Sequence, residues 1–189
     1  MKIYIAAPLY SQGEKDFNLK IDTLIRKKDL EYKKTKGAME ELSILLGFDV
    51  HTIEAFDNSN IQGASAVSAM VSYLDGVPNK KMYRKYKIKT VVGANDYLTM
   101  QEVVTRRYKD LENNPDLIVM DGGEIQVNAC KIALSTLERD IPVLGLVKDD
   151  NHKTRCLYYE GKEINIEKNG YLFRLLENIQ EEVHRYAIT

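Results

Sequence analysis

Leu117-Ile-Val-Met-Asp-Gly-Gly123 is the most informative segment of this 189-residue chain, because four apolar residues end abruptly at an aspartate and two glycines. A short apolar run bounded by turn residues is typical of a strand buried in a sheet. Residues 123–138 then have apolar side chains at helical spacing, and residues 142–147 form a second short apolar run. We therefore predict strand, helix and strand here, with the helix burying Ile125, Ala129, Ile132, Ala133 and Leu137.

Upstream of this segment the pattern changes to short strands separated by a tight turn. Thr52–Asp57 is mostly apolar, Ala64–Leu74 is rich in small and β-branched residues, and Lys80–Lys89 follows the turn Asp75-Gly-Val-Pro78. These three runs predict an antiparallel meander. A helix over residues 96–110 leads into the buried strand described above. A three-strand meander followed by helix, strand, helix and strand predicts a mixed α/β sheet with helices on both faces.

The N-terminal part of the chain carries a less specific pattern. Lys2–Ala6 is a candidate strand, and the charge-rich residues 11–36 indicate a solvated arm or an exposed helix. Thr35–Leu46 has apolar residues three and four apart and predicts a helix. We expect an N-terminal strand and linker helix over residues 1–34 and one α/β domain over residues 35–189.

The last predicted helix begins near Gly170 and has one strongly apolar face. His184 falls on the edge of that face, beside Gln180 and Phe173. A histidine at such an edge is commonly a surface or capping residue, but a docked helix can also present it to a crevice. The buried face is predicted to consist of Leu172, Leu175, Leu176, Ile179, Val183 and Tyr186.

Composition and charge exclude several classes of protein. The net charge is -1, so any nucleic-acid binding must come from a local patch. The two cysteines, Cys130 and Cys156, are far apart in sequence, which excludes a disulfide scaffold and a zinc knuckle and fits reduced thiols in the cytoplasm. No apolar run reaches the length of about 18 residues that a membrane span needs, so we expect no membrane partner.

Three aspartates stand where an apolar pattern stops. Asp57 and Asp121 each close a predicted strand, and Asp96 opens a helix. In an open α/β sheet the carboxyl ends of the strands face the ligand crevice. Two carboxylates that meet there repel each other unless a cation lies between them, and hard oxygen ligands suit Mg²⁺ or Mn²⁺.

Each of these aspartates also has a plain structural interpretation. Asp57 can begin a turn, because aspartate bonds its own backbone there. Asp96 is a good helix N-cap. Asp121 with its two glycines can be an ordinary strand-to-helix turn; a phosphate loop lacks the usual lysine and hydroxyl ending.

The most basic segment is Lys80–Lys89, which holds six cationic residues and no acidic one. On a strand, Tyr83 shares one face with four lysines, and that face suits a phosphate backbone with the tyrosine packed on a sugar or base. The alternative is an edge strand that its lysines protect from further pairing. Arg106 and Arg107 add charge on the polar side of their helix. The four lysines are Lys81, Lys85, Lys87 and Lys89.

Six segments in the same order resemble the C-terminal nuclease domain of UvrC, the excision-repair endonuclease subunit. Several long motifs in the right order are highly specific, and they cover residues 35–189, whereas residues 1–34 match less well. The segments are Ile53-Glu-Ala-Phe-Asp-Asn-Ser-Asn-Ile-Gln-Gly63, Tyr83-Arg-Lys-Tyr-Lys-Ile-Lys89, Asp96-Tyr-Leu-Thr-Met-Gln-Glu-Val-Val-Thr-Arg-Arg-Tyr108, Pro115-Asp-Leu-Ile-Val-Met-Asp-Gly-Gly123, Ile141-Pro-Val-Leu-Gly-Leu-Val-Lys-Asp149 and Glu182-Val-His-Arg-Tyr-Ala-Ile-Thr189.

The resemblance implies an RNase H-like fold and metal-dependent hydrolysis of a phosphodiester, making the incision 5′ to a lesion in damaged double-stranded DNA. The family's catalytic positions are held here by Asp57, Asp96, Asp121 and His184. Of these, Asp57, Asp121 and His184 are expected to hold Mg²⁺ or Mn²⁺. Lys148, in the fifth segment, joins the expected DNA contacts.

Two departures from the family bear on function. The family follows Asp-Gly-Gly with Lys-Gly, whereas Glu124 and Ile125 stand here, which removes a cation beside the crevice and adds an acid. The family's GIY-YIG nuclease, UvrB-contact region and helix-hairpin-helix module are absent from these 189 residues. We therefore expect a UvrB-type damage-loading subunit to bind through regions outside this chain. The alternative to an endonuclease is a non-catalytic RNase H-like module that binds DNA or a protein.

Overall fold

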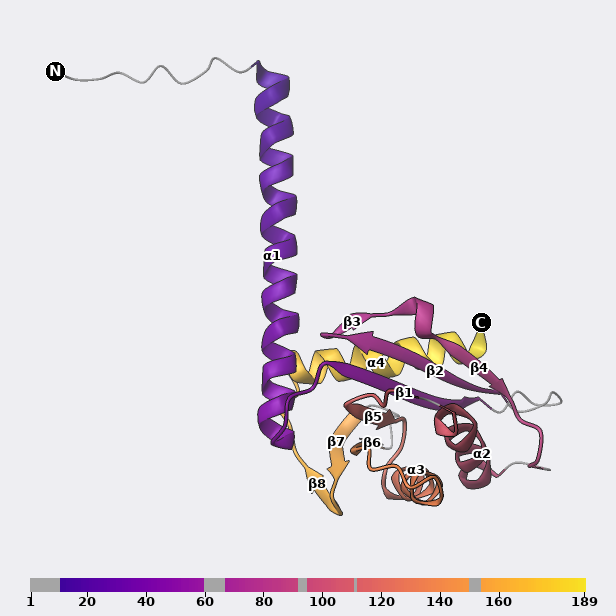
Figure 1. Ribbon diagram of the computed structural model, residues 1–189. Coiled ribbons are helices and arrows are strands. Elements are labelled where there is room, and N and C mark those ends of the chain that lie inside the picture. Colours follow the sequence, from indigo (N-terminus) through magenta and orange to yellow (C-terminus); the bar gives the residue numbers. More distant parts are fainter. Residues whose placement is uncertain (1–10, 60–66, 92–94, 111, 150–153) are drawn as a thin grey trace. The chain divides into compact units, whose positions relative to one another are not determined.

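The computed structural model describes residues 11–59, 67–91, 95–110, 112–149 and 154–189. In this part of the chain eight strands form one sheet, in the order β3-β2-β1-β5-β6-β7-β8, with β4 also paired to β2 (Figure 1). The predicted mixed α/β sheet is confirmed. The strands are β1 (Thr52–Ser59), β2 (Val67–Leu74), β3 (Val77–Pro78), β4 (Arg84–Lys87), β5 (Leu117–Met120), β6 (Val143–Lys148), β7 (Thr154–Tyr159) and β8 (Lys162–Ile164).

The centre of the sheet is parallel and both flanks are antiparallel. β1 runs parallel to β5, and β5 runs parallel to β6. β2 and β4 extend the sheet antiparallel beyond β1, and β7 and β8 extend it antiparallel beyond β6. Because β1, β5 and β6 are parallel, their carboxyl ends meet at one edge, which is where a ligand crevice forms in such sheets.

Helices cover both faces of the sheet. α4 packs on β1 and β2, whereas α2 and α3 pack together on the other face (Figure 1). The core on the α4 side also takes in Ala38, Met39 and Leu42. The helices are α1 (Gln12–Leu46), α2 (Asp96–Tyr108), α3 (Glu124–Thr136) and α4 (Tyr171–Ile188), with a 3-10 helix at Lys80–Met82.

The chain divides into two compact units, Met1–Lys34 and Thr35–Thr189. α1 runs through the boundary, so the exposed helix that is one of the two expectations for residues 11–36 and the helix expected over Thr35–Leu46 form one continuous helix. Its residues 12–33 are exposed, in keeping with their charge-rich sequence. The predicted strand Lys2–Ala6 lies outside the described residues. No helix in the described part of the chain combines the length and apolar character that crossing a membrane requires.

The third strand of the predicted meander is wrong over most of its length. Lys80–Met82 forms a 3-10 helix, and only Arg84–Lys87 forms a strand. The reason is the pairing with β2, where residues 71–72 lie opposite the five residues 79–83. Residues 79–83 are therefore too many to pair with β2 and loop away from the sheet. Pro78, which precedes them, has no backbone N–H to donate to a strand hydrogen bond.

The predicted buried face of α3 is right in part: Ala129 and Ala133 are buried and Leu137 is partly buried, but the two isoleucines are not. Ile125 and Ile132 are 65% and 48% exposed, whereas Val127, Cys130 and Leu134 are buried. The contacts of α3 with α2 and β6 bury these three residues beside the two predicted alanines.

Candidate active site

Asp57 and Asp121 follow neighbouring positions in the parallel strands β1 and β5. Phe56 pairs with Met120, and the Asp121 backbone N–H donates to the Phe56 carbonyl at 3.1 Å. The next residue along each strand is the aspartate, and only 9% of the Asp57 side chain and 4% of the Asp121 side chain are exposed. The structure therefore brings the two predicted acids to the same edge of the sheet.

The edge of the sheet where Asp57 and Asp121 meet gathers negative charge. Burial and the neighbouring Asp121 carboxylate raise the pKa of Asp57 above its usual range, and His184 and Lys148 offset this only in part. A carboxyl group that resists ionisation beside a second acid marks a place where a cation is favoured.

Helix α4 presents two polar side chains to the two aspartates. His184 Nδ1 lies 3.0 Å from Asp57 Oδ2, and Gln180 Nε2 donates to Asp121 Oδ1 at 2.9 Å. Residues four apart lie on the same face of a helix, so one helix reaches both acids. The His184 side chain is 62% exposed, at the edge of the apolar stripe that holds α4 on the sheet.

The contact with Asp57 fixes the hydrogen on the His184 ring. When Asp57 is ionised its carboxylate only accepts hydrogen bonds, so Nδ1 carries the hydrogen and donates it. In the neutral ring the lone pair then lies on Nε2. That nitrogen can accept a proton or bind a cation.

Lys148, at the end of β6, contacts the same carboxylate as Gln180. Its Nζ lies 2.8 Å from the Asp121 carboxylate, and one third of the lysine side chain is exposed (33%). The sequence predicts Lys148 as a DNA contact. The structure adds a second property: Lys148 is the counter-ion of Asp121.

Asp96 is the first residue of α2 but is not its N-cap. Asn95 is the N-cap, because its side chain accepts from the Leu98 N–H at 3.0 Å. The Asp96 backbone carbonyl accepts a hydrogen bond of 3.1 Å from Asn58, which joins the start of α2 to the end of β1. The capping interpretation of Asp96 is therefore wrong, and its catalytic role stays a prediction.

Among the residues that the structure describes, no three histidine, cysteine, aspartate or glutamate side chains gather as a ready-made metal cage. Asp57 pairs with His184, and Asp121 pairs with Lys148 and Gln180. The site therefore combines two acids and one histidine with a lysine ammonium as its internal cation.

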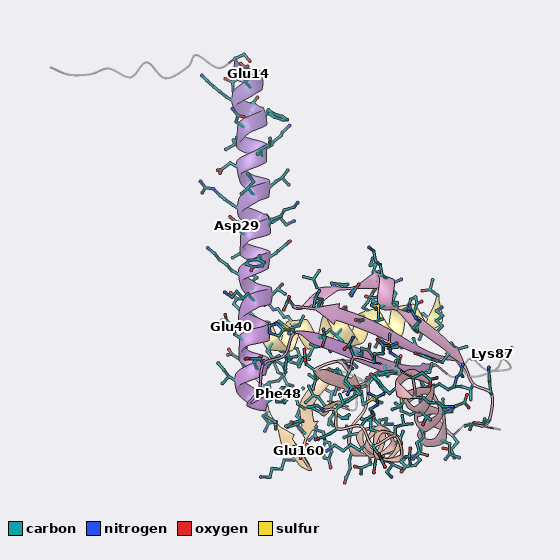
Figure 2. The ribbon with its side chains drawn as sticks, in the orientation of Figure 1. Glu14, Asp29, Glu40, Phe48, Lys87 and Glu160 are labelled. Carbon is teal, nitrogen blue, oxygen red and sulfur yellow. The ribbon has the colours of Figure 1, made fainter. Side chains whose placement is uncertain are left out.

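Lys85 lies on the same face of the sheet as Asp57. Lys85 pairs with Ala69, and Ala69 pairs with Asp57, so the three side chains form one row across β4, β2 and β1. Two strand spacings, about 10 Å, separate the ends of this row. Lys85 Nζ lies 5.0 Å from the centre of the Tyr186 ring. Lys87, labelled in Figure 2, continues this face toward the carboxyl end of β1.

Two other residues of the basic segment are not placed as predicted. Tyr83 is 7% exposed and packs edge-on against Tyr186, with 5.1 Å between the ring centres. The prediction that Tyr83 packs on a sugar or base is therefore wrong. Lys81 lies in the 3-10 helix, so it does not share a strand face with Lys85.

The predicted exposure of Arg107 is also wrong. Its Nε donates to Glu54 Oε2 at 3.0 Å, the Tyr108 hydroxyl donates to the same oxygen at 2.6 Å, and only 10% of the arginine side chain is exposed. Arg107 therefore belongs to a buried network that joins α2 to β1. Arg106 stays nearer the surface, 34% exposed, and pairs with Glu102 at 3.0 Å.

These two neighbouring arginines should differ sharply in their effect on stability. Arg107→Gln leaves the buried Glu54 carboxylate without its cationic partner, so we expect the free energy of unfolding to fall by about 3 kcal/mol. Arg106→Gln removes a partly exposed ion pair and should cost less than about 1 kcal/mol. Urea unfolding of both variants measures the difference, and equal losses would contradict the buried network.

Glu102 fixes the end of the basic segment. Its carboxylate accepts hydrogen bonds from the backbone N–H groups of Lys89 and Thr90. Burial opposes ionisation of Glu102, but these bonds, the Thr90 hydroxyl and Arg106 together lower its pKa to about 2. Lys89 is thereby tied to α2 through its backbone, and the residue is exposed.

Glu124 stands where the resemblance expects a lysine. It is the first residue of α3, where a negative charge stabilises the helix terminus, and it is exposed. Burial and the Glu124 carboxylate together raise the pKa of Tyr158. The Glu124 carboxylate therefore interacts with the N-terminus of α3 and with Tyr158 of β7.

Gln180 and Thr154 contact the site but were not expected there from the sequence. Gln180 lies four residues before His184 on one helix, and this spacing is the sequence pattern that could have placed Gln180 beside His184 at the site. Thr154 begins β7 after a stretch without a regular pattern, and its part in the site follows only from its contact with Gln180 at 2.6 Å.

The mixed sheet, with acids from two parallel strands and a histidine from the last helix brought to one edge, defines the class as an RNase H-like domain. The chain belongs to the UvrC RNase H endonuclease domain family, whose model matches residues 43–188. The nuclease class expected from the sequence is therefore confirmed.

Three relatives are each named UvrABC system protein C. The protein of Alkaliphilus oremlandii is 45% identical over 181 residues, and the match covers 85% of this chain and 29% of that protein. The protein of Clostridioides difficile is 49% identical, covering 84% and 26%, and that of Pediococcus pentosaceus is 43% identical, covering 96% and 32%. The chain thus spans about a third or less of the length of these curated relatives.

Two solved endonuclease V structures also align with the chain. The Bacillus subtilis protein is 18% identical with a TM-score of 0.36, covering 53% of this chain and 46% of that chain. The Ciona intestinalis protein in complex with DNA is 14% identical with a TM-score of 0.39, covering 87% and 69%. Scores of this size do not establish a shared fold.

Proposed function

We propose that this domain cuts damaged double-stranded DNA on the 5′ side of a lesion in nucleotide excision repair, with Mg²⁺ or Mn²⁺ held by Asp57 and Asp121. The observation that carries the proposal is the buried pair of acids, Asp57 near the carboxyl end of β1 and Asp121 just after β5, with His184 bonded to one of them.

The residues at this edge fit a divalent cation. Mg²⁺ keeps several waters and is commonly bound by one or two carboxylates together with substrate phosphates. Asp57 and Asp121 supply two carboxylates, so a cage of three protein ligands is not required. When bound, such an ion activates water and stabilises the negative charge that develops on the phosphate.

The side chains around the two acids have distinct proposed roles. Asp57 orients the His184 ring, whose Nε2 is placed to take a proton from the attacking water or to bind the cation. Lys148 supplies a positive charge for a phosphate oxygen. Asp96 is proposed as a further ligand or as a residue that orients one.

Basic residues beside the crevice are proposed to hold the DNA backbone. Lys85 and Lys87 share the α4 face of β4, and Lys89 and Arg106 lie near the end of that strand. We further propose a cytoplasmic domain that a UvrB-type subunit brings to damaged DNA through regions outside this chain.

DNA binding should depend steeply on salt, because phosphate contacts release counterions. Replacing Lys85, Lys87 and Lys89 with glutamine should reduce the slope of log K against log salt by about 0.9 for each phosphate that is no longer neutralised. Fluorescence anisotropy with a labelled duplex measures the slope. Lys162→Gln, on β8 at the opposite edge of the sheet, should leave it unchanged. An unchanged slope in the triple variant would place the DNA elsewhere.

Incision of a lesion-bearing duplex in Mg²⁺, with the damage-loading proteins supplied, tests the proposed activity. We expect a nick 5′ to the lesion that EDTA prevents. The alternative is a non-catalytic module, and the pairing of Lys148 with Asp121 favours it because the lysine takes the place of a cation. Such a module would bind the duplex and leave it uncut.

A further inference from the structure

A chain of hydrogen-bonding side chains ends on Asp121. Thr154, the first residue of β7, donates its hydroxyl hydrogen to Gln180 Oε1 at 2.6 Å. Gln180 in turn donates from Nε2 to Asp121 Oδ1 at 2.9 Å. Thr154 is 2% exposed and Gln180 is half-buried, so water competes poorly for these bonds.

The chain has a fixed direction. An amide oxygen only accepts hydrogen bonds and an amide nitrogen only donates them. An ionised carboxylate also only accepts, so the Gln180 nitrogen faces Asp121, and Oε1 is left to accept from the Thr154 hydroxyl. A flipped amide would set its oxygen against the Asp121 carboxylate, two acceptors with no hydrogen between them, and would turn its nitrogen toward the Thr154 hydroxyl.

Thr154 also adjoins Lys148, the other residue that contacts Asp121. Lys148 and Thr154 pair across β6 and β7, where the register shifts after Val147. Such irregularities redirect side chains and occur often beside active sites. Asp121 is therefore held by an ammonium, which competes with a metal ion for the carboxylate, and by an amide, which adds no charge.

We propose that Gln180, oriented by Thr154, is a positioning residue that holds the Asp121 carboxylate in place for the divalent cation. This inference rests on the metal-dependent incision proposed above. It makes α4 responsible for both acids: His184 orients Asp57 and is oriented by it, and Gln180 fixes Asp121.

The test measures Mn²⁺ affinity in the full chain from the electron paramagnetic resonance signal of free Mn²⁺. Gln180→Met preserves side-chain length and removes the donor, so affinity should fall about tenfold, as loss of a residue that orients a ligand commonly produces. Thr154→Val should also lower the Mn²⁺ affinity, whereas Thr154→Ser, which keeps the hydroxyl, should bind Mn²⁺ as the wild type does. Glu181→Gln, exposed on the same helix, should match the wild type.

Incision kinetics give a second readout that a general loss of stability would not produce. In Gln180→Met we expect kcat to fall while the KM for DNA stays unchanged, because the phosphate contacts are intact. A wild-type kcat in this variant would contradict the positioning role.

The outcomes separate this inference from the proposed function. Wild-type Mn²⁺ affinity in Gln180→Met and Thr154→Val, with weakened affinity in Asp57→Asn, overturns the positioning role and leaves the metal site standing. Wild-type affinity in Asp57→Asn overturns the metal site and this inference with it. If circular dichroism shows that Gln180→Met does not fold, the test rests on Thr154→Val and Thr154→Ser. Equal Mn²⁺ affinities in these two variants would overturn the positioning role of Gln180.

Discussion

Incision by the Asp57→Asn variant is expected to fall by at least about 1,000-fold, because a bound cation supplies several kcal/mol of transition-state stabilisation and about 4 kcal/mol corresponds to that factor. Asp57 is the member of the carboxylate pair that contacts His184, and it also lies in the field of the Asp121 carboxylate. The thermal stabilisation that Mn²⁺ gives the wild type should largely disappear in the same variant. A nicking gel and a thermal melt with and without Mn²⁺ measure the two effects.

Without metal, the same substitution should not destabilise the protein. Burial and Asp121 raise the pKa of Asp57, so the folded state binds this proton more tightly than the unfolded state does. Wild-type stability should therefore decrease as pH rises through the raised pKa, starting from the unfolded value of about 3.9. Asp57→Asn lacks this group and should lose that part of the pH dependence.

Asp140→Asn is the matched control, because Asp140 is an exposed aspartate outside the crevice. It should incise DNA and respond to Mn²⁺ as the wild type does. An Asp57→Asn protein that incises at the wild-type rate would show that the carboxylate pair does not carry the chemistry.

His184→Ala is expected to fold normally and to lose at least about 100-fold in incision rate, the scale on which a general acid or base contributes. The side chain is 62% exposed, so its removal leaves little cavity in the core. His184→Asn separates orientation from proton transfer, because its amide can donate to Asp57 but offers no basic nitrogen. We expect the asparagine variant to be as slow as the alanine variant.

Single-turnover incision with the damage-loading proteins measures these rates without interference from product release. If His184→Asn incises like the wild type, the ring contributes its hydrogen bond to Asp57 and no base. If both variants incise at the wild-type rate, the aspartates act without the histidine.

Much of the fold follows from sequence periodicity. The buried strand Leu117–Met120 was predicted with the bounds that the structure shows, because a short run of four apolar residues between turn residues has few alternatives. The apolar stripe of α4 was equally clear, and with it the boundary position of His184. These elements are specified locally, so local patterns predict them.

The predictions that are wrong concern residues whose structure is decided by contacts with residues far away in the sequence. The basic segment looks like one strand, but pairing with β2 accommodates only Arg84–Lys87. Arg107 looks exposed, because the spacing along α2 does not reveal that Glu54 lies beneath it in β1. The role inferred for Gln180 depends on Thr154, which no spacing in the sequence connects to it.

The most decisive measurement is the anomalous density of a crystal of this chain soaked in Mn²⁺. The proposed mechanism predicts a peak between the Asp57 and Asp121 carboxylates, beside His184, with the Lys148 ammonium moved off Asp121. A Mn²⁺ peak elsewhere, with Lys148 still bound to Asp121 and the crevice free of metal, would contradict it.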